Sequence, residues 1–308
     1  MASVYDKYGV RYSEKGTTLI KCPKTFKGEY IIPDGVVSIT QSAFYGCRDL
    51  TTIGIPDSVK RIGSFAFSGC SSLLSIAIPD AVKTIETHTF ADCESLASVK
   101  IGNSVESIEY YAFDNCKALS SIVFPNSLWC IDKDAFYGCS ALASVAIPDS
   151  VTFIGRKAFY GCSSLTSIVI PDSVESIGRM AFKGCSSLKS VKLPESIRYI
   201  DNGVFWDCST LEFISIPSKV KIVGMSGFEG CKDLVSIIIP EGVKRIEESA
   251  FENCSNLISI TLPQSLRCIE DNVFSGCSSL KSINVPAGMK NYFDTLLFEK
   301  FKDIIVEI

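Results

Sequence analysis

The apolar residues of this chain recur with a fixed period of 23 residues. Phenylalanine marks the period most clearly, because it occupies eleven positions spaced 23 apart, and a cysteine follows three residues after each one. These phenylalanines are Phe44, Phe67, Phe90, Phe113, Phe136, Phe159, Phe182, Phe205, Phe228, Phe251 and Phe274. No insertion breaks the register over residues 33–285, which hold eleven complete repeats. Such strict self-similarity is the signature of a repeat protein in which each unit packs against its neighbours.

Within one repeat, residues 148–170, the pattern predicts a short strand and a return of the chain across the core. The L-x-x-I-x-I spacing of Leu165, Ile168 and Ile170 is typical of a strand with one face inward. The proline that opens the next repeat has no N–H to donate and therefore ends the strand. Val151, Ile154, Ala158 and Phe159 return the chain across the core. Stacking of the repeats would align their strands about 4.8 Å apart in a parallel sheet.

The residue before each repeated cysteine predicts a tight turn with a left-handed backbone. It is glycine in seven repeats, aspartate at Asp92 and Asp207, and asparagine at Asn115 and Asn253. These are the residue types that tolerate a positive φ. We therefore expect the same turn in every repeat.

The two ends of the chain depart from the repeat and are predicted to be caps. Residues 10–22 have the pattern of a β-hairpin. At the other end, residues 292–301 have helical apolar spacing, with Asn291 and Asp294 as expected cap residues. Residues 304–308 then supply a last strand.

These features predict one mainly β repeat solenoid domain over residues 1–308. A hairpin cap would occupy residues 1–32, the eleven repeats residues 33–285, and a helix–strand cap residues 286–308. We expect a continuous parallel sheet on one face and short turns or 3-10 segments on the other.

The balance of basic and acidic residues argues against some classes of binding partner. Thirty basic and 34 acidic residues give a net charge of −4, which argues against nucleic-acid binding and against a polybasic membrane surface. No apolar run approaches the ~18 residues that would span a bilayer, so we expect no membrane insertion. The segment after Met1 lacks the basic and apolar regions of a signal peptide, which favours a cytoplasmic location if Met1 is the native start.

The fourteen cysteines and the single histidine do not suggest a reaction centre. There is no C-x-x-C pair and no glycine-rich phosphate loop. We interpret the repeated cysteines as buried thiols, because free cysteine behaves as a small apolar residue. Cys22, Cys130 and Cys268 lie outside the repeated column and are expected to be the accessible ones. His88 is expected to be a solvated surface residue without an oriented partner. We therefore expect no catalytic residue, no metal and no cofactor.

The repeated pattern IPDSV…IG..AF.GCSSL.SI resembles the BspA-like leucine-rich repeats, the treponemal class of that superfamily, over nearly the whole chain. This resemblance implies a leucine-rich-repeat solenoid. It also implies a secreted or surface-attached protein that acts in adhesion and binding and has no catalytic activity.

Two columns of strand residues are predicted to face outward, and they provide the candidate binding surface. The first holds nine serines and one threonine, with Phe213 as its one large member. The second carries Val123, Val169 and Ile238 among small or polar residues. Rigid aromatic side chains surrounded by small neighbours are typical of interface anchors. The structural alternative is that small residues merely suit a crowded sheet face.

Large aromatic residues gather at variable positions of repeats five to eight, where Trp129, Tyr160, Tyr199 and Trp206 join the candidate surface. We predict that a protein partner, such as a host or cell-surface protein, lies along the strand face of repeats five to nine. One alternative is a glycan-binding surface protein that stacks sugars on these rings. Another is an intracellular scaffold. The oligomeric state is left open.

Overall fold

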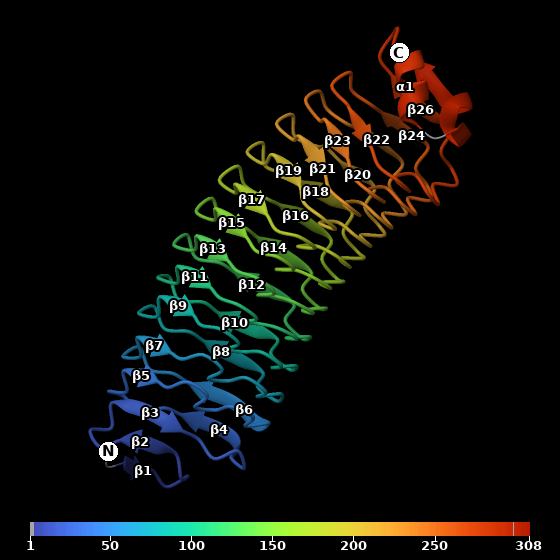
Figure 1. Cartoon of the computed structure of the whole chain (residues 1–308). Coiled ribbons are helices and arrows are strands. Elements are labelled where there is room, and N and C mark those ends of the chain that lie inside the picture. Colours follow the sequence, from blue (N-terminus) through green and yellow to red (C-terminus); the bar gives the residue numbers. More distant parts are fainter. Residues whose placement is uncertain (1–2, 298) are drawn as a thin grey trace. The chain divides into compact units, whose positions relative to one another are not determined.

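The computed structural model describes residues 3–297 and 299–308, which divide into two compact units, residues 1–163 and residues 164–308. Both units are built from the 23-residue repeat, with two short parallel ladders running through each. Within each unit, the even-numbered strands between β4 and β26 follow one another in one row and the odd-numbered strands between β5 and β25 in another (Figure 1). The repeat solenoid predicted from the sequence is therefore confirmed. The single domain expected from the unbroken period stays a prediction.

In the first unit, the main ladder follows the predicted strand of each repeat. Neighbouring strands pair in parallel, and residues 23 apart lie opposite each other, as in Ser98↔Ser75 and Ser121↔Ser144. The strands are β4 (Lys27–Ile31), β6 (Asp49–Gly54), β8 (Ser75–Ala77), β10 (Ser98–Lys100), β12 (Ser121–Val123) and β14 (Ser144–Ala146). This ladder pairs without interruption from β4 to β14.

The N-terminal cap of the first unit contains the predicted hairpin. β2 (Arg11–Ser13) pairs antiparallel with β3 (Thr18–Lys21), and β1 (Ser3–Tyr5) adds a further antiparallel strand to β2. β3 then pairs in parallel with the first strand of the second ladder. The hairpin thus leads directly into the repeat array.

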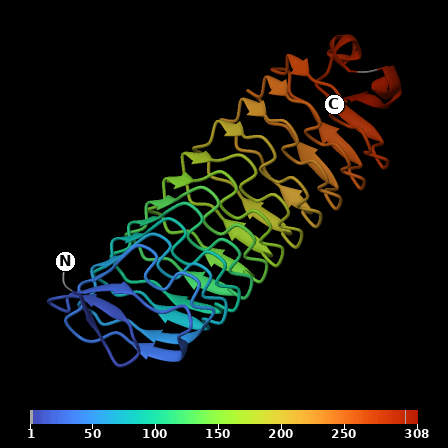
Figure 2. The same ribbon diagram turned by 60° about the horizontal axis from the view of Figure 1, so that its bottom comes forward.

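The second ladder of the first unit consists of two-residue strands where the sequence suggested only turns or 3-10 segments. Its strands are β5 (Ser38–Ile39), β7 (Arg61–Ile62), β9 (Thr84–Ile85), β11 (Ser107–Ile108), β13 (Cys130–Ile131) and β15 (Phe153–Ile154). They are too short to show an alternating pattern in the sequence. Figure 2 shows both rows of strands from a second direction.

The second unit has the same two ladders. The main row contains β16 (Ser167–Val169), β18 (Ser190–Lys192), β20 (Phe213–Ile214), β22 (Ser236–Ile238), β24 (Ser259–Thr261), β26 (Ser282–Val285) and β27 (Ile305–Glu307). The other row contains β17 (Ser176–Ile177), β19 (Tyr199–Ile200), β21 (Ile222–Val223), β23 (Arg245–Ile246) and β25 (Cys268–Ile269). The main sheet, expected to be continuous, is interrupted here: β20 pairs with β18 and β22 with β24, but β20 and β22 form no ladder pair.

The C-terminal cap differs in detail from the prediction. The helix α1 spans Lys290–Leu296 and is followed by the 3-10 helix η1 (Glu299–Ile304) before β27. Met289 is the N-cap residue and makes no side-chain capping bond, so the expected capping role of Asn291 and Asp294 is wrong. The helix begins one residue before Asn291, which places both residues inside it.

The phenylalanine column forms the core of both units. These side chains are at most 3% exposed, and adjacent rings stack nearly parallel in each unit. Ring centroids are 5.2 Å apart for Phe113 and Phe136, and 5.3 Å apart for Phe228 and Phe251. Cysteines beside these rings donate their S–H to a phenylalanine carbonyl of the preceding repeat, as Cys116 does to Phe90 at 3.2 Å. Repetition therefore satisfies both the apolar and the polar groups of the core.

Two residues of every repeat have a left-handed backbone. The residues before the cysteines have φ between 56° and 74°, as predicted. A second left-handed residue, two positions before each phenylalanine, was not predicted, because bulky residues such as Phe65, Tyr111 and Met180 occupy it. The N–H of Phe65 donates to Thr87 in the next repeat at 3.0 Å, and that of Met180 to Asn202 at 2.9 Å. Hydrogen bonding between repeats thus offsets the cost of the strained φ.

Candidate functional site

His88 does not have the surroundings of a catalytic base. Its ring lies between those of Phe65 and Tyr111, with centroid distances of 4.5 and 4.7 Å and nearly parallel planes. The expectation of a solvated histidine is wrong, because the repeat period places three aromatic rings at the left-handed position of successive repeats. Burial within this stack lowers the pKa of His88. The side chain serves packing between repeats.

The cysteines are dispersed along the core rather than gathered at a site. All fourteen are free; twelve are buried, and Cys268 and Cys277 are half-buried. The accessibility expected for Cys22 and Cys130 is wrong, since both are buried. Burial raises the pKa of the Cys130 thiol to about 11. Over residues 3–297 and 299–308, no group of three histidine, cysteine or acidic side chains could hold a metal ion.

The strand face of the second unit carries the exposed apolar side chains that the sequence predicted. Phe213 is 63% exposed on β20 and Ile238 is 70% exposed on β22, while Val169 is exposed on β16. Their neighbours in the main ladder include Ser190, which pairs with Phe213 in register. The structure therefore brings Phe213 and Ile238 onto adjacent strands of one face.

A groove of about 460 Å³ lies where the ladder opens between β20 and β22. It is formed by residues 190–191, 213–215 and 236–238, none of which is charged. Ile214 is half-buried, although the equivalent residues Val191 and Ile237 are buried. The opening thus adds a concave apolar surface to a face on which serine is the commonest outward residue.

Two further apolar side chains on this face were not predicted. Val235 and Ile258 are exposed at the position just before β22 and β24. Their signal in the sequence is a column that is otherwise small, polar or charged in this unit, with Lys189 and Glu212 at the preceding repeats. A column-by-column comparison of repeats would have found them.

Three of the predicted site residues lie in the first unit. Val123 is 82% exposed on β12, where Lys100 and Ala146 are its neighbours in register. Trp129 is exposed just before β13. Tyr160 is half-buried and stacks on Tyr137 with a centroid distance of 4.6 Å.

The remaining two aromatic residues lie away from the strand face of the second unit. Tyr199 is exposed on β19 of the other ladder, and Trp206 is half-buried in a turn with Lys183 Nζ over its ring. In the first unit, Lys157 Nζ lies 5.5 Å from the Tyr160 ring centroid. The faces of Tyr160 and Trp206 are thus covered by a neighbouring ring or by lysine. That arrangement does not favour stacking of sugars on them.

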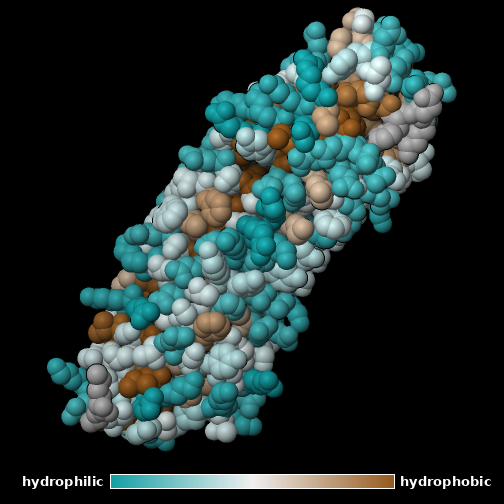
Figure 3. All heavy atoms as spheres, in the orientation of Figure 1, coloured by the Kyte–Doolittle hydropathy of each residue, from teal (hydrophilic) through white to brown (hydrophobic). Residues whose placement is uncertain are grey.

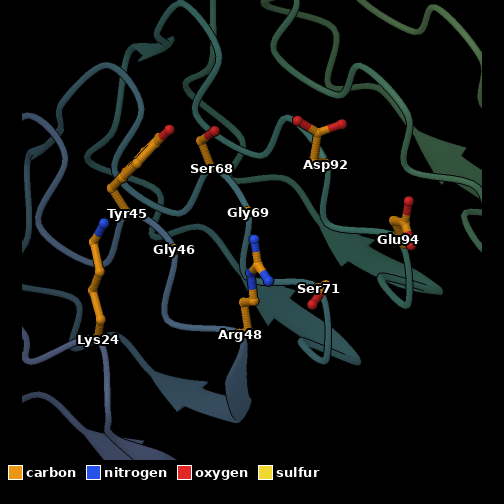
Figure 4. Close-up of a pocket in the computed structure, with 9 residues that line it drawn as sticks. All are labelled: Lys24, Tyr45, Gly46, Arg48, Ser68, Gly69, Ser71, Asp92 and Glu94. Atoms are coloured by element: carbon orange, nitrogen blue, oxygen red, sulfur yellow. The ribbon is translucent and has the colours of Figure 1, made fainter.

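A second hollow, of about 630 Å³, lies in the first unit beside the N-terminal cap (Figure 4). Lys24 and Tyr45 line one side, Asp92 and Glu94 the other, and Arg48 projects between them. Lys24 Nζ lies 5.2 Å from the Tyr45 ring centroid. The hollow therefore has charges of both signs.

The acidic side of this hollow already has partners. Glu94 forms an ion pair with Lys117 at 2.8 Å, and Asp92 accepts a hydrogen bond from Asn115 Nδ2 at 3.2 Å. A ligand would have to compete with these contacts. The groove at β20 and β22 is the better candidate, because its apolar surface has no partner to displace.

Comparison with known proteins identifies the repeat. The family described as the BspA type leucine rich repeat region matches residues 24–140, 106–234 and 199–305. No functionally curated protein matches the chain. No helix in the described residues is long and apolar enough to cross a membrane.

Solved structures of bacterial leucine-rich repeat proteins are similar to this chain. A leucine rich cell surface protein from Faecalibacterium prausnitzii is 28% identical, with a TM-score of 0.52, over 91% of this chain and 81% of that protein. A leucine-rich repeat protein from Bacteroides ovatus is also 28% identical, with a TM-score of 0.49, over 94% of each chain. The pneumococcal vaccine antigen PcpA is 15% identical, with a TM-score of 0.56, over 99% of this chain and 97% of that one.

Proposed function

Since this chain belongs to the BspA-type leucine-rich repeat family, we propose that it is a non-catalytic module that binds a protein partner through the strand face of the second unit, residues 164–308. The observation that carries this proposal is the exposed Phe213, which replaces a serine in an otherwise small and polar column and lies beside an open groove. Large exposed apolar groups on a soluble surface are typical of interaction sites. Apolar areas lie among hydrophilic ones on the face shown in Figure 3.

We also propose that the chain acts at a cell surface, in adhesion to a host or neighbouring cell. The F. prausnitzii relative, which covers 91% of this chain, is described as a cell surface protein, and this supports the proposal. Protein binding is preferred over glycan binding because the rings of Tyr160 and Trp206 are engaged within their own units.

The test compares three forms of the protein as bait for detergent extracts of host-cell surfaces, with captured proteins identified by mass spectrometry. Phe213→Ser restores the serine of the column and should weaken binding of the main partner by at least about 1 kcal/mol. Ile31→Ser is the matched control, since Ile31 is 80% exposed on β4 in the first unit. A partner that binds wild type and Phe213→Ser equally would remove the strand face from consideration.

A further inference from the structure

We propose that the groove at β20 and β22 binds an extended segment of the partner, which inserts an apolar side chain and carries carboxylates on both sides of it. This inference rests on the proposed function and specifies the partner for the same face. It follows from three observations: the open ladder, the apolar lining and the charges around it.

The open ladder provides the space and the backbone groups. β20 pairs with β18 only at Ser190↔Phe213 and Val191↔Ile214, whereas β22 pairs with β24 at three positions. Between β20 and β22 no pair is formed, so backbone groups on the facing edges of both strands are not used in the main ladder. Exposed strand edges bind extended peptides through main-chain hydrogen bonds. An extended segment therefore suits this opening better than a helix does.

The lining favours an uncharged side chain in the centre. Phe213 and Ile238 flank the groove, Val235 and Ile258 continue the apolar surface along the face, and Ser215 and Ser236 supply hydroxyl groups. A volume of about 460 Å³ lies in the lower part of the range of about 300–1,000 Å³ typical of ligand pockets. The groove can hold one or two side chains of a segment rather than a folded domain.

The charges around the apolar surface are mainly positive, although the whole chain carries −4. Lys189 and Lys192 are exposed on the β18 side, and Lys281 is exposed beyond Ile258. None of the three forms an ion pair with another described residue, in contrast to Lys83 and Lys117 of the first unit. Glu212 is the acidic residue among them. Opposite charges at a rim guide association and set the orientation of a partner, so carboxylates are expected on both sides of the anchor.

The probes are three fluorescein-labelled peptides that share one length. The first has a Leu-Phe-Ile centre with two aspartates on each side, the second replaces the aspartates by lysines, and the third replaces the centre by serines. Fluorescence anisotropy with the full chain should show saturable binding of the first peptide. The other two should bind at least about tenfold more weakly, a difference of about 1.4 kcal/mol.

Variants of the chain assign the binding to this groove. Phe213→Ser should weaken binding of the first peptide about tenfold, and Phe213→Leu should retain most of the affinity. The control Ile31→Ser should leave the affinity unchanged. The double variant Lys189→Glu/Lys192→Glu should weaken the aspartate peptide and strengthen the lysine peptide. Circular dichroism would verify that each variant is folded.

The proposal is overturned if no peptide binds saturably, if all three bind alike, or if charge reversal leaves the preference unchanged. These outcomes are distinct from failure of the proposed function. If a captured protein partner is lost with Phe213→Ser but is insensitive to charge reversal, the strand face stands as the binding surface and the acidic segment is wrong. If the partner is insensitive to Phe213→Ser, the strand face itself is wrong.

Discussion

The repeats of the first unit and those of the second share the same core residues, but the outward faces of their main ladders differ. From β4 to β14 the strands pair without a gap, and from β6 onward the outward column is a threonine followed by serines. In the second unit Phe213 enters that column and the ladder opens beside it. The phenylalanine and cysteine columns continue unchanged in both. The comparison teaches that core packing fixes the stacking of repeats and leaves the outward strand positions free to carry function.

The largest effect is expected on the free energy of unfolding, from substitutions that compare the phenylalanine cores of the two units. Phe113→Ala in the first unit and Phe228→Ala in the second should each cost about 3–5 kcal/mol of the free energy of unfolding, because each removes a fully buried ring and leaves a cavity. Urea unfolding followed by circular dichroism measures this cost. Phe274→Ala in the last repeat should cost less, since its nearest stacked ring is farther away, at 6.2 Å. A difference of several kcal/mol between Phe113→Ala and Phe228→Ala would contradict the common core.

Thiol reactivity should differ between the two units, because only the second unit has half-buried cysteines. The thiolate is the reactive form, and burial raises the pKa of cysteines such as Cys93 and Cys139 well above the usual range. Because all cysteines of the first unit are buried, they should be protected from iodoacetamide in the native protein, and modification should be found mainly at the half-buried Cys268 and Cys277. All fourteen should react after denaturation. Mass spectrometry that finds native Cys22 or Cys130 modified would show that the first unit opens more readily than its packing indicates.

Hydrogen exchange tests the open ladder itself. The amides of residues 211–216 should exchange at least about tenfold faster than those of 119–124, the equivalent residues of the first unit, because strands that lack a partner open at lower free energy. Exchange measured by mass spectrometry on overlapping peptides resolves the two segments. Equal protection would mean that β20 and β22 are joined in solution. A bound partner should slow exchange at 211–216 and 236–238 but not at 119–124.

The smallest expected effect concerns Asp114, in the first unit. Burial, followed by the charges of Asp92 and Asp134, raises the pKa of its carboxyl from 3.8 to about 6. An acid with a raised folded-state pKa stabilises the native protein most below its unfolded value, and this contribution is lost as the pH rises through about 6. Asp114→Asn should therefore raise Tm at about pH 7.5 and change it little near pH 3.5.

The control for this effect is the exposed Asp149→Asn, for which thermal melts should differ little from wild type at either pH. A gain for Asp114→Asn that is independent of pH would contradict a titration effect. It would point instead to the hydrogen-bonding capacity of the amide, since one carboxylate oxygen of Asp114 is buried without a hydrogen-bond partner.

The sequence predicts features of this fold that depend on the repeat as a whole. The strand of each unit, the phenylalanine core and the turn before each cysteine follow from residue types that recur in every copy. The second left-handed position is not predictable in this way, because Phe65 and Met180 accept that backbone only through a bond to the next repeat. The backbone preference of a residue in isolation takes no account of a hydrogen bond to the neighbouring repeat.

Features that belong to single repeats are harder to predict. The burial of Cys130 and the ring stack around His88 depend on side chains of adjacent copies rather than on their own segment. For the candidate site, the sequence indicates Phe213 and Ile238 as departures from their columns, and the structure places them on adjacent strands. The gap between β20 and β22 was not predicted: Phe213 and Ile238 are unusual side chains beside it, but side-chain identity alone does not indicate whether two neighbouring strands pair.

The left-handed residues two positions before each phenylalanine form a column whose hydrogen bonds run from one repeat to the next. Each member up to Ser249 is followed by another repeat, and Phe65, Met180 and Ser249 all donate their N–H to the repeat that follows. The last member is Asn272, a residue type that tolerates this backbone by itself. The final copy can therefore end the series, whereas a copy with phenylalanine or methionine at that position requires a successor. We therefore expect that moving a copy with phenylalanine or methionine at this position to the end of the array would destabilise it, whereas the copies that carry Asp134 or Gly203 there would be tolerated better. The repeats are similar in sequence without being fully interchangeable in order.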